Sequence, residues 1–281
     1  MSRSLAAGGA PLLPVTPALG VACALLLAVA ALVAGRGGLG HGRAVLRAGL
    51  RAAVQLALVA LVIAWVVRSL WTSALFVLLM FAVAVRTAGR RIGEGRIGEG
   101  RIGEGRGSGS AGRGSAGRWE WAWAAVPIAA GVLPVLLLLA ATGLLPAKGI
   151  TVIPVAGILI GGALTATSLA GRRALDELRL RHGEVEAALA LGFEERDARL
   201  EICRTAAATS LVPALDQTRT VGLVTLPGAF VGMLLGGATP VQAGAVQLFV
   251  LVALLAVEAV AVTAVLELVG RGLVGAAPGV R

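Results

Sequence analysis

The chain has 281 residues, of which 57% are hydrophobic and only 14% are charged, and its mean hydropathy is +0.89. Soluble domains carry about a quarter charged residues, so this composition excludes an ordinary soluble enzyme or binding domain. The net charge of +10 does not indicate nucleic acid as a partner, because the basic residues fall between apolar segments and no basic motif with interleaved aromatics occurs. We expect a protein embedded in the lipid bilayer.

Seven apolar segments predict an all-α fold. About 20 apolar residues cross the roughly 30 Å hydrocarbon core of a bilayer, and each segment approaches or exceeds that length. The segments are 17–35, 44–67, 71–87, 119–144, 150–171, 210–235 and 241–269. The expected fold class is a polytopic membrane helix bundle of about seven transmembrane helices, in a single domain over 1–281.

The first apolar segment has two interpretations. Ala34 and Gly35 are small residues of the kind found at signal-peptide cleavage sites. However, Arg3 lies far from the apolar run, and four arginines follow the run between Arg36 and Arg51. This pattern favours a retained helix whose C-terminal end lies in the cytoplasm.

The distribution of basic residues predicts the orientation. With the N-terminus outside and the C-terminus inside, 21 of the 25 Lys and Arg residues fall on the cytoplasmic side. Only Arg3, Arg68 and Lys148 fall outside, and Arg219 lies at the start of the sixth segment. Cytoplasmic loops carry an excess of Lys and Arg, so the bias supports this orientation.

A low-complexity stretch separates the third and fourth segments. Between Arg91 and Gly105 the motif Arg-Ile-Gly-Glu-Gly occurs three times, and Gly, Ser and Arg follow it. Five residues are too few for a stacking repeat, and this composition buries too little apolar surface to offset the entropy of ordering. We expect 89–118 to be a flexible cytoplasmic loop.

The charged stretch 172–209 carries a spaced motif. Glu186, Ala187 and Ala188 precede Gly192, and Ile202 follows Gly192 after nine intervening residues. This spacing resembles the EAA loop of ABC transporter permeases, although Cys203-Arg204 replaces the Leu-Pro that usually follows. The resemblance implies a short helix–Gly–helix coupling loop that docks onto an ATPase subunit.

No Walker A motif occurs in the sequence. We therefore expect the ATPase, with its ATP and Mg²⁺, to be a separate chain, and no cofactor bound by this one. The chain has only two histidines, His41 and His182, and two cysteines, Cys23 and Cys203, in patterns that match neither a metal cluster nor a nucleophile with its base. These counts predict neither an enzyme nor a particular metal.

Proline and glycine predict where the translocation pathway lies. Pro154 and Gly157 fall in the fifth segment, and Thr225, Pro227 and Gly228 fall near the centre of the sixth. Proline removes a backbone hydrogen bond, and backbone freed at membrane depth must face protein or a water-filled cavity. Packing kinks are the alternative explanation for both sites.

Polar residues inside the segments add two pathway candidates. Glu258 lies near the middle of the seventh segment, where a carboxylate costs at least about 2.5 kcal/mol on insertion scales. It should be protonated, paired or facing a polar cavity, and a helix–helix hydrogen bond is its alternative role. Gln55 in the second segment is expected to line the pathway or to bond a neighbouring helix. Asp216 and Arg219 share a helix face and are expected to pair.

Four longer motifs indicate a more specific resemblance among the ABC transporter permeases. Val221-Gly222-Leu223-Val224-Thr225-Leu226-Pro227-Gly228, with Gly232 after it, resembles the signature of the FetB-type permeases, an iron-export ABC transporter family related to plant aluminium-tolerance half-transporters. Three more stretches look like other motifs of that family: 51–56, 153–157 and 240–247. The resemblance covers about 40–270 apart from the Arg-Ile-Gly-Glu-Gly insertion. Family members tend to carry Met and Asn around 158–164, where this chain has Ile158, Gly162 and Leu164.

The resemblance implies a homodimeric permease in the plasma membrane, paired with a separate ABC ATPase and involved in metal (iron) export. The expected function is therefore the membrane subunit of an ABC exporter. The alternative is a non-transporting membrane scaffold or regulator that recruits a soluble partner through 172–209.

Overall fold

The computed structural model describes residues 16–38, 40–94, 122–144, 146 and 148–274. The chain divides into two compact units, Met1–Arg68 and Ser69–Arg281. Within the described residues the structure is helical, and no β-strand occurs among them. Most of the expected loop 89–118 lies outside the described residues, although its first residues continue a helix as far as Glu94.

The first unit is a helical hairpin of α1 (Pro17–Arg36) and α2 (Gly42–Val66). Gly38 and Gly40 in the connection have φ values of +73° and +66°, which glycine adopts without steric cost. The helices approach closely at Gly49, where an added Cβ would lie 2.5 Å from a Leu27 methyl group. Small residues therefore set the spacing of the two helices.

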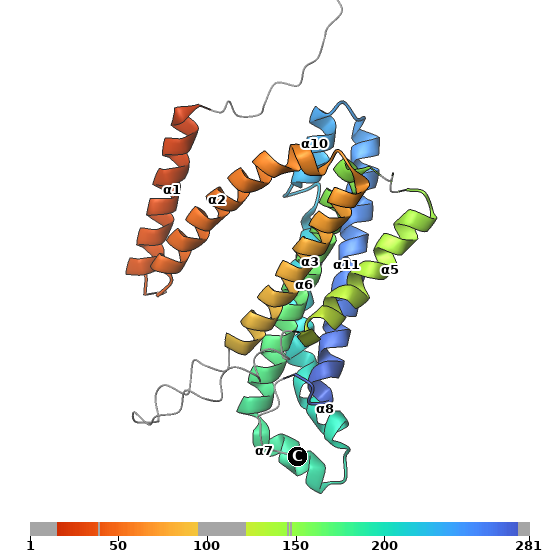
Figure 1. The fold of residues 1–281 in the computed structure, drawn as a ribbon. Coiled ribbons are helices and arrows are strands. Elements are labelled where there is room, and N and C mark those ends of the chain that lie inside the picture. The colour runs from red at the N-terminus through yellow and green to blue at the C-terminus, as the bar shows by residue number, and fades with distance from the viewer. Residues whose placement is uncertain (1–15, 39, 95–121, 145, 147, 275–281) are drawn as a thin grey trace, which may run out of the picture. The chain divides into compact units, whose positions relative to one another are not determined.

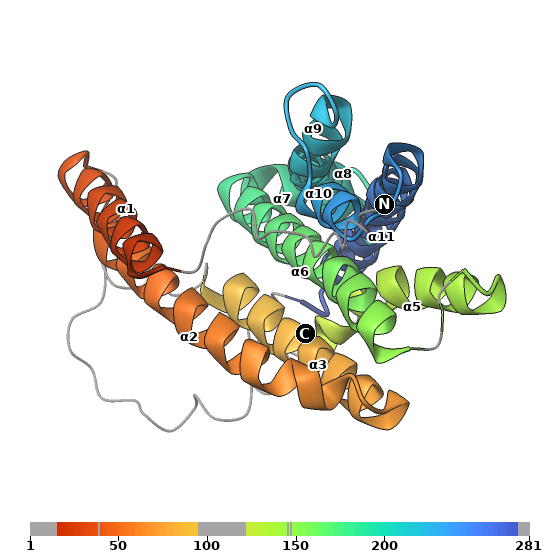
Figure 2. The same ribbon diagram turned by 90° about the horizontal axis from the view of Figure 1, so that it is seen from above.

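The second unit is built around α6 (Gly149–Leu180), which packs against α3 (Leu70–Glu94), α5 (Ala125–Ala141) and α11 (Pro240–Gly270). Figure 2 shows α6 between α3 on one side and α8 and α11 on the other. Alanines spaced seven residues apart on α6, among them Ala156, Ala163 and Ala170, are fully buried. Small side chains at this spacing allow neighbouring helices to pack closely without a large apolar core.

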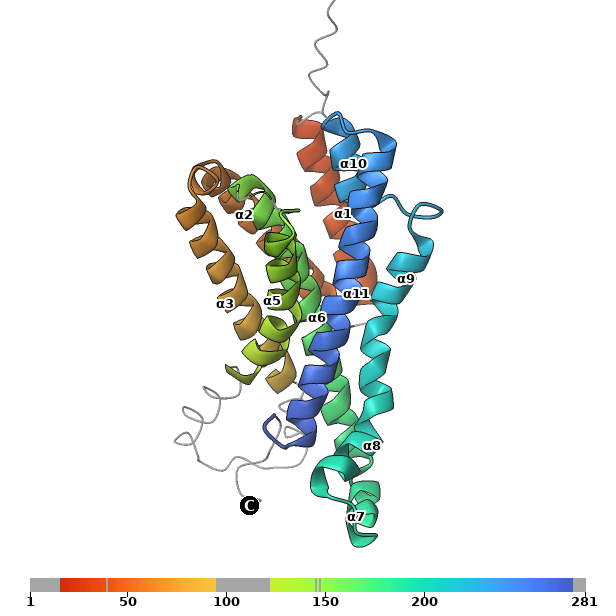
Figure 3. The ribbon, with the colours of Figure 1, turned by 90° about the vertical axis from the view of Figure 1, so that its right-hand side faces the viewer.

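After α6 the chain forms the short helix α7 (His182–Ala190) and reverses direction at the turn around Gly192. It continues without a gap through α8 (Glu195–Ala208), the 3₁₀ turn η1 (Thr209–Leu211) and α9 (Val212–Thr220). Helices α8 and α9 follow α11 along its length, as Figure 3 shows. After a non-helical segment, α10 (Gly228–Leu235) returns to the start of α11, where Thr239 and Gln242 form a capping box. Figure 1 shows α7 and α8 at one end of this unit and α10 at the other.

Five described helices are long and apolar enough to cross a membrane, namely α1, α2, α3, α6 and α11. The expected fourth span is the shorter apolar helix α5, with 17 residues. The expected sixth span, 210–235, is not one helix, because α9 ends at Thr220 and α10 begins at Gly228 with Pro227 at its N-cap. The count of seven spans and the orientation of the termini stay predictions.

The expected break at Pro154 in the fifth span is wrong, since α6 is helical from Gly149 to Leu180. Pro154 lies inside α6 and removes one hydrogen bond, to the carbonyl of Ile150 near the start of the helix, but α6 continues because it packs against α3, α5 and α11.

Candidate functional site

The predicted helix–Gly–helix in 172–209 is present. Helix α7 is followed by Gly192, whose φ is +91°, and α8 begins three residues later. The N–H of Phe193 donates to the carbonyl of Ala188 at 3.1 Å, which closes the end of α7 as in a Schellman motif. Gly192 thus occupies the left-handed position that makes the turn between the two helices.

The junction of α6 and α7 is fixed by Arg181. Its guanidinium donates to Glu184 and, at 3.3 Å, to Glu177, which joins the last turn of α6 to the first turn of α7. The hydrogen bond from Arg181 lowers the pKa of Glu184. The start of α7 is therefore tied to the end of the long helix α6.

Ile202 and Ala188 lie inside the α7–α8 element. Ile202 is buried with Val185 and Ala198, and Ala188 packs against the same cluster. Ile202 is therefore a contact between the two short helices and not an exposed docking residue. This small core gives α7 a defined position on α8.

Apolar side chains on the outer side of the α7–α8 turn are exposed. Leu191 is 80% exposed and Phe193 is 51% exposed, while Ala187 and Glu186 are also exposed on α7. A cluster of large apolar residues on a turn that is otherwise charged is typical of a surface that contacts another protein. Within the motif, Glu186, Ala187 and Gly192 are the residues available to a partner.

Helix α8 is attached to the end of α11 by ion pairing and close packing. Arg196 donates from Nε to Oε1 of Glu267 at 2.9 Å and from Nη2 to Oε2 at 2.7 Å. Arg271 donates to the same carboxylate at 2.6 Å. Gly270 leaves room for Leu200, because an added Cβ there would lie 2.9 Å from Leu200 Cγ. Helix α8 is therefore joined to the end of α11 by both charged and apolar contacts.

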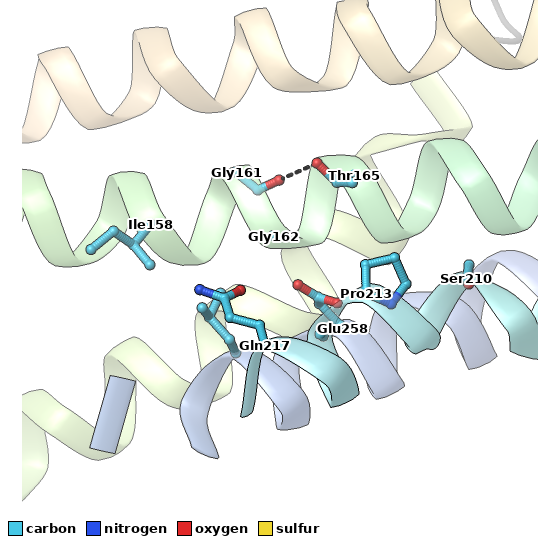
Figure 4. Close-up of a pocket in the computed structure, with 10 residues that line it drawn as sticks. Ile158, Gly161, Gly162, Thr165, Ser210, Pro213, Gln217 and Glu258 are labelled. Carbon is cyan, nitrogen blue, oxygen red and sulfur yellow. Dashed lines mark hydrogen bonds between the residues drawn. The ribbon is translucent and has the colours of Figure 1, made fainter. Parts of the chain in front are cut away.

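A cavity of about 290 Å³ lies between α6, η1, α9 and α11. Figure 4 shows Glu258 and Gln217 directed toward α6 from α11 and α9. The α6 wall consists of Ile158, Gly161, Gly162 and Thr165, which recur at helical spacing on one face. The remaining wall consists of Ser210, Pro213, Ala214 and Leu254.

Glu258 faces this cavity and reaches close to the backbone of α6. A Cβ added at Gly162 would lie 3.0 Å from Glu258 Oε1 and 2.6 Å from a Leu254 methyl carbon. Glu258 forms no hydrogen bond or ion pair with any other residue that the structure describes, so the alternative helix–helix hydrogen bond is not formed within those residues. None of the ten lining residues is basic.

The other predicted pathway residues lie elsewhere. Gln55 is exposed on α2 in the first unit, and Pro154 is exposed near the start of α6. Gly157 faces α3, because an added Cβ would lie 2.8 Å from Met80 Cε. The lining of the cavity includes neither Thr225 nor Pro227 nor Gly228.

The segment 221–227 is a compact non-helical turn. Gly222, with φ at +81°, donates its N–H to the carbonyl of Thr225 at 2.8 Å, and Val221 and Thr225 form an isolated bridge. The side chains of Leu223 and Val224 are 90% and 78% exposed. The predicted helix break is present, and its apolar side chains point away from the second unit's own core.

Sequence reasoning missed Ser210, Gln217 and the Arg196–Glu267 pair. Ser210 is 2% exposed, and its hydroxyl has no hydrogen-bond partner within the described part of the chain. Nothing local marks these residues, since their roles arise from contacts with α11, tens of residues further along the chain.

The predicted Asp216–Arg219 pair is present at 3.6 Å. Over the described ranges, no three His, Cys, Asp or Glu side chains gather as metal ligands.

Comparison with known proteins places these features in a family. The sequence model described as uncharacterised protein family UPF0014 matches residues 18–274. The chain is 39% identical to Protein ALUMINUM SENSITIVE 3 of Arabidopsis thaliana over 128 residues. This match covers 46% of this chain and 47% of that protein. It is 38% identical to UPF0014 membrane protein STAR2 of Oryza sativa subsp. japonica, over 46% of this chain and 45% of the relative.

A bacterial relative gives a similar result. The chain is 33% identical to the Probable iron export permease protein FetB of Escherichia coli (strain K12), over 45% of this chain and 48% of that protein. The chain thus matches about half the length of these curated relatives. No solved structure matches it. The apolar helices and these relatives together show a multi-pass membrane protein.

Proposed function

The chain belongs to the uncharacterised protein family UPF0014, and on that basis we propose that it is the membrane permease subunit of an ATP-driven metal exporter. The observation that carries the proposal is the α7–α8 element, a helix–Gly–helix that projects from the helix bundle with exposed apolar side chains at its turn. A separate ABC ATPase would contact this element, and ATP binding and hydrolysis would take place on that chain.

The attachment of α8 supports transmission of movement from the ATPase. Because Arg196 holds Glu267 at two points, a partner that shifts α7 and α8 also displaces the end of α11. Helix α11 carries Glu258, which faces the cavity beside α6. The chain therefore has a continuous path from its docking element to a polar cavity, the arrangement that coupled transport requires.

A metal as cargo is supported by the relatives and not by a chelating cluster. The relative from Escherichia coli bears the name of a probable iron export permease, and the Arabidopsis relative is named for aluminium sensitivity. We place the protein in the plasma membrane with the α7–α8 element in the cytoplasm, as the Arg bias predicts. Iron is then the first cargo to test.

A second copy of the chain would complete the permease. If the segment 221–227 lies within the bilayer, its non-helical backbone needs a protein surface over it, because lipid supplies no hydrogen bonds. Leu223 and Val224 are available for that contact. A homodimer should give a disulfide cross-link between two copies of a Leu223→Cys variant, and absence of the cross-link across a series of neighbouring positions would contradict this interface.

Co-purification tests the proposed function. The full chain should be expressed with candidate ABC ATPases from the same genome, and one of them should co-purify with it and hydrolyse ATP in lipid. If the α7–α8 element instead captured only a partner without a nucleotide-binding fold, the protein would be a membrane scaffold and not a transporter.

A further inference from the structure

The cavity between α6, α9 and α11 is lined by oxygen atoms that have no partner among the residues that the structure describes. The Glu258 carboxylate and the Gln217 amide form no hydrogen bond with any residue in the described ranges. The Ser210 hydroxyl, 2% exposed, lines the same cavity and is equally unpartnered over those ranges. Ser210 is the buried member of the three, while Glu258 is half-buried and Gln217 is exposed. Buried hydroxyls are nearly always hydrogen-bonded, so the unpartnered Ser210 oxygen beside the Glu258 carboxylate indicates that a polar species occupies the cavity.

The α6 wall gives the carboxylate room. Gly162 lies beside Glu258, and any larger residue would place its Cβ 3.0 Å from Oε1. The neighbouring Thr165 is exposed, and its hydroxyl is already used in a 3.0 Å hydrogen bond to the carbonyl of Gly161. The volume of about 290 Å³ would hold about nine water molecules, enough for an ion with part of its hydration shell.

The ligand chemistry of the lining is that of a hard cation. The cavity offers one carboxylate with hydroxyl and amide oxygens, and neither a thiolate nor an imidazole lines it. Because it also lacks a basic side chain, an anion would meet only repulsion from Glu258. Carboxylate, carbonyl and water oxygens suit divalent ions that retain water, and soft ions prefer sulfur.

We infer that this cavity binds a partly hydrated divalent metal cation, with Glu258 as the charged ligand and Ser210 and Gln217 as neutral oxygen ligands. The inference rests on the proposed export function and specifies where its cargo stays during transport. A single charged ligand makes binding weak, in the millimolar range that sites with few charges show. Weak binding suits a transport pathway, because the ion must leave as well as enter.

Mn²⁺ is a direct probe of this site, since its electron paramagnetic resonance signal falls when the ion is bound. The full chain in lipid nanodiscs, without the ATPase, should bind Mn²⁺ saturably with a Kd of about 1 mM. Glu258→Gln should raise the Kd at least about tenfold, Ser210→Ala should raise it about two- to fivefold, and Glu258→Asp should bind between wild type and Glu258→Gln. Asp216→Asn, which removes a carboxylate paired with Arg219 outside the cavity, should bind as wild type does.

Two results would overturn the inference: no saturable binding to the wild-type chain up to about 10 mM Mn²⁺, or the same affinity in Glu258→Gln as in wild type. If Glu258→Gln fails to insert, the Mn²⁺ affinities of Ser210→Ala and Gly162→Ala test the site in its place. Wild-type Mn²⁺ affinity in both variants refutes the site. Because the binding measurement contains no ATP and no ATPase, it tests the cavity independently of the proposed export function. Intact Mn²⁺ binding without ATP-driven transport would refute export alone, and wild-type transport by Glu258→Gln would refute this cavity alone.

Discussion

Arg196 on α8 and Glu267 on α11 form a two-point ion pair, with N–O distances of 2.9 and 2.7 Å, between residues 71 positions apart in the sequence. The planar guanidinium bonds both carboxylate oxygens at once, so the pair fixes the relative orientation of the two side chains as well as the distance between them. Its hydrogen bonds raise the pKa of Arg196 further above its ordinary value, so the pair stays charged at physiological pH. It is the most direct mechanical link between the docking element and the helix that carries Glu258.

Breaking this link should uncouple the two subunits. Arg196→Gln should leave ATPase association intact but reduce ATP-driven transport roughly three- to thirtyfold, because docking would no longer displace α11. Both partners are partly exposed, so we expect little change in thermal stability. The measurement is transport per ATP hydrolysed in proteoliposomes.

Glu201→Gln is the matched control, because Glu201 is an exposed carboxylate on the same helix. The double exchange Arg196→Glu with Glu267→Arg should recover part of the coupling. Equal coupling in Arg196→Gln and wild type would remove this ion pair from the mechanism.

The turn at Gly192 should be required for docking. At φ +91° a β-branched residue is strained by about 1–3 kcal/mol, so Gly192→Val should distort the turn and abolish co-purification of the ATPase without preventing insertion. Ala188→Asp should have the same effect by placing a carboxylate against Val185 and Ile202. Gly183→Ala is the control, since Gly183 is helical and an added Cβ meets nothing within 4 Å. Wild-type association of both Gly192→Val and Ala188→Asp would exclude this element as the docking site.

Cys203 should resist modification in the folded protein. It is fully buried, and burial raises the pKa of its thiol to about 11, so little thiolate is present near neutral pH. In a Cys23→Ser background, maleimide should label Cys203 about a hundredfold more slowly than a cysteine placed at exposed Glu201. The labelling rate should rise with pH until about 11 and then level off, because the thiolate is the reactive form. Rapid labelling at pH 7.5 would mean that α8 does not pack as described.

Thiol accessibility also tests the orientation. Lys148→Cys should react with an impermeant reagent in intact cells, whereas Glu186→Cys should react only after permeabilisation, because the Arg bias places 172–209 in the cytoplasm. Both positions are exposed or adjoin helix ends, so accessibility depends on the side of the membrane. The reverse pattern would invert the topology.

The local features of this fold could be read from the sequence, and the contacts between distant segments could not. Gly192 marked the turn between α7 and α8, and Pro227 marked the start of α10, because each residue acts on its own backbone. Pro154 does not end its helix, because packing of α6 against α3, α5 and α11 maintains the helix through the proline, and the sequence does not show that packing. Glu258 stood out as an isolated charge, but its neighbours Ser210 and Gln217 come from segments that only the packing of α9 on α11 brings near.

Ile202 shows the same limit of prediction from sequence within the spaced motif that runs from Glu186 to Ile202. Its spacing from Gly192 was recognisable, but spacing cannot distinguish a residue that contacts a partner from one that packs beneath the contact surface. In the structure Ile202 is buried against Val185 and Ala198.

The most direct test of the account is ATP-driven metal transport by the reconstituted pair. Inside-out vesicles containing this chain and its ATPase should accumulate radioactive iron when ATP is added, since export from the cytoplasm becomes uptake into such vesicles. Accumulation should be absent with an inactive ATPase and strongly reduced by Glu258→Gln, while the ATPase stays bound. Failure of vesicles with an active, bound ATPase to accumulate iron or any other divalent metal would contradict the account.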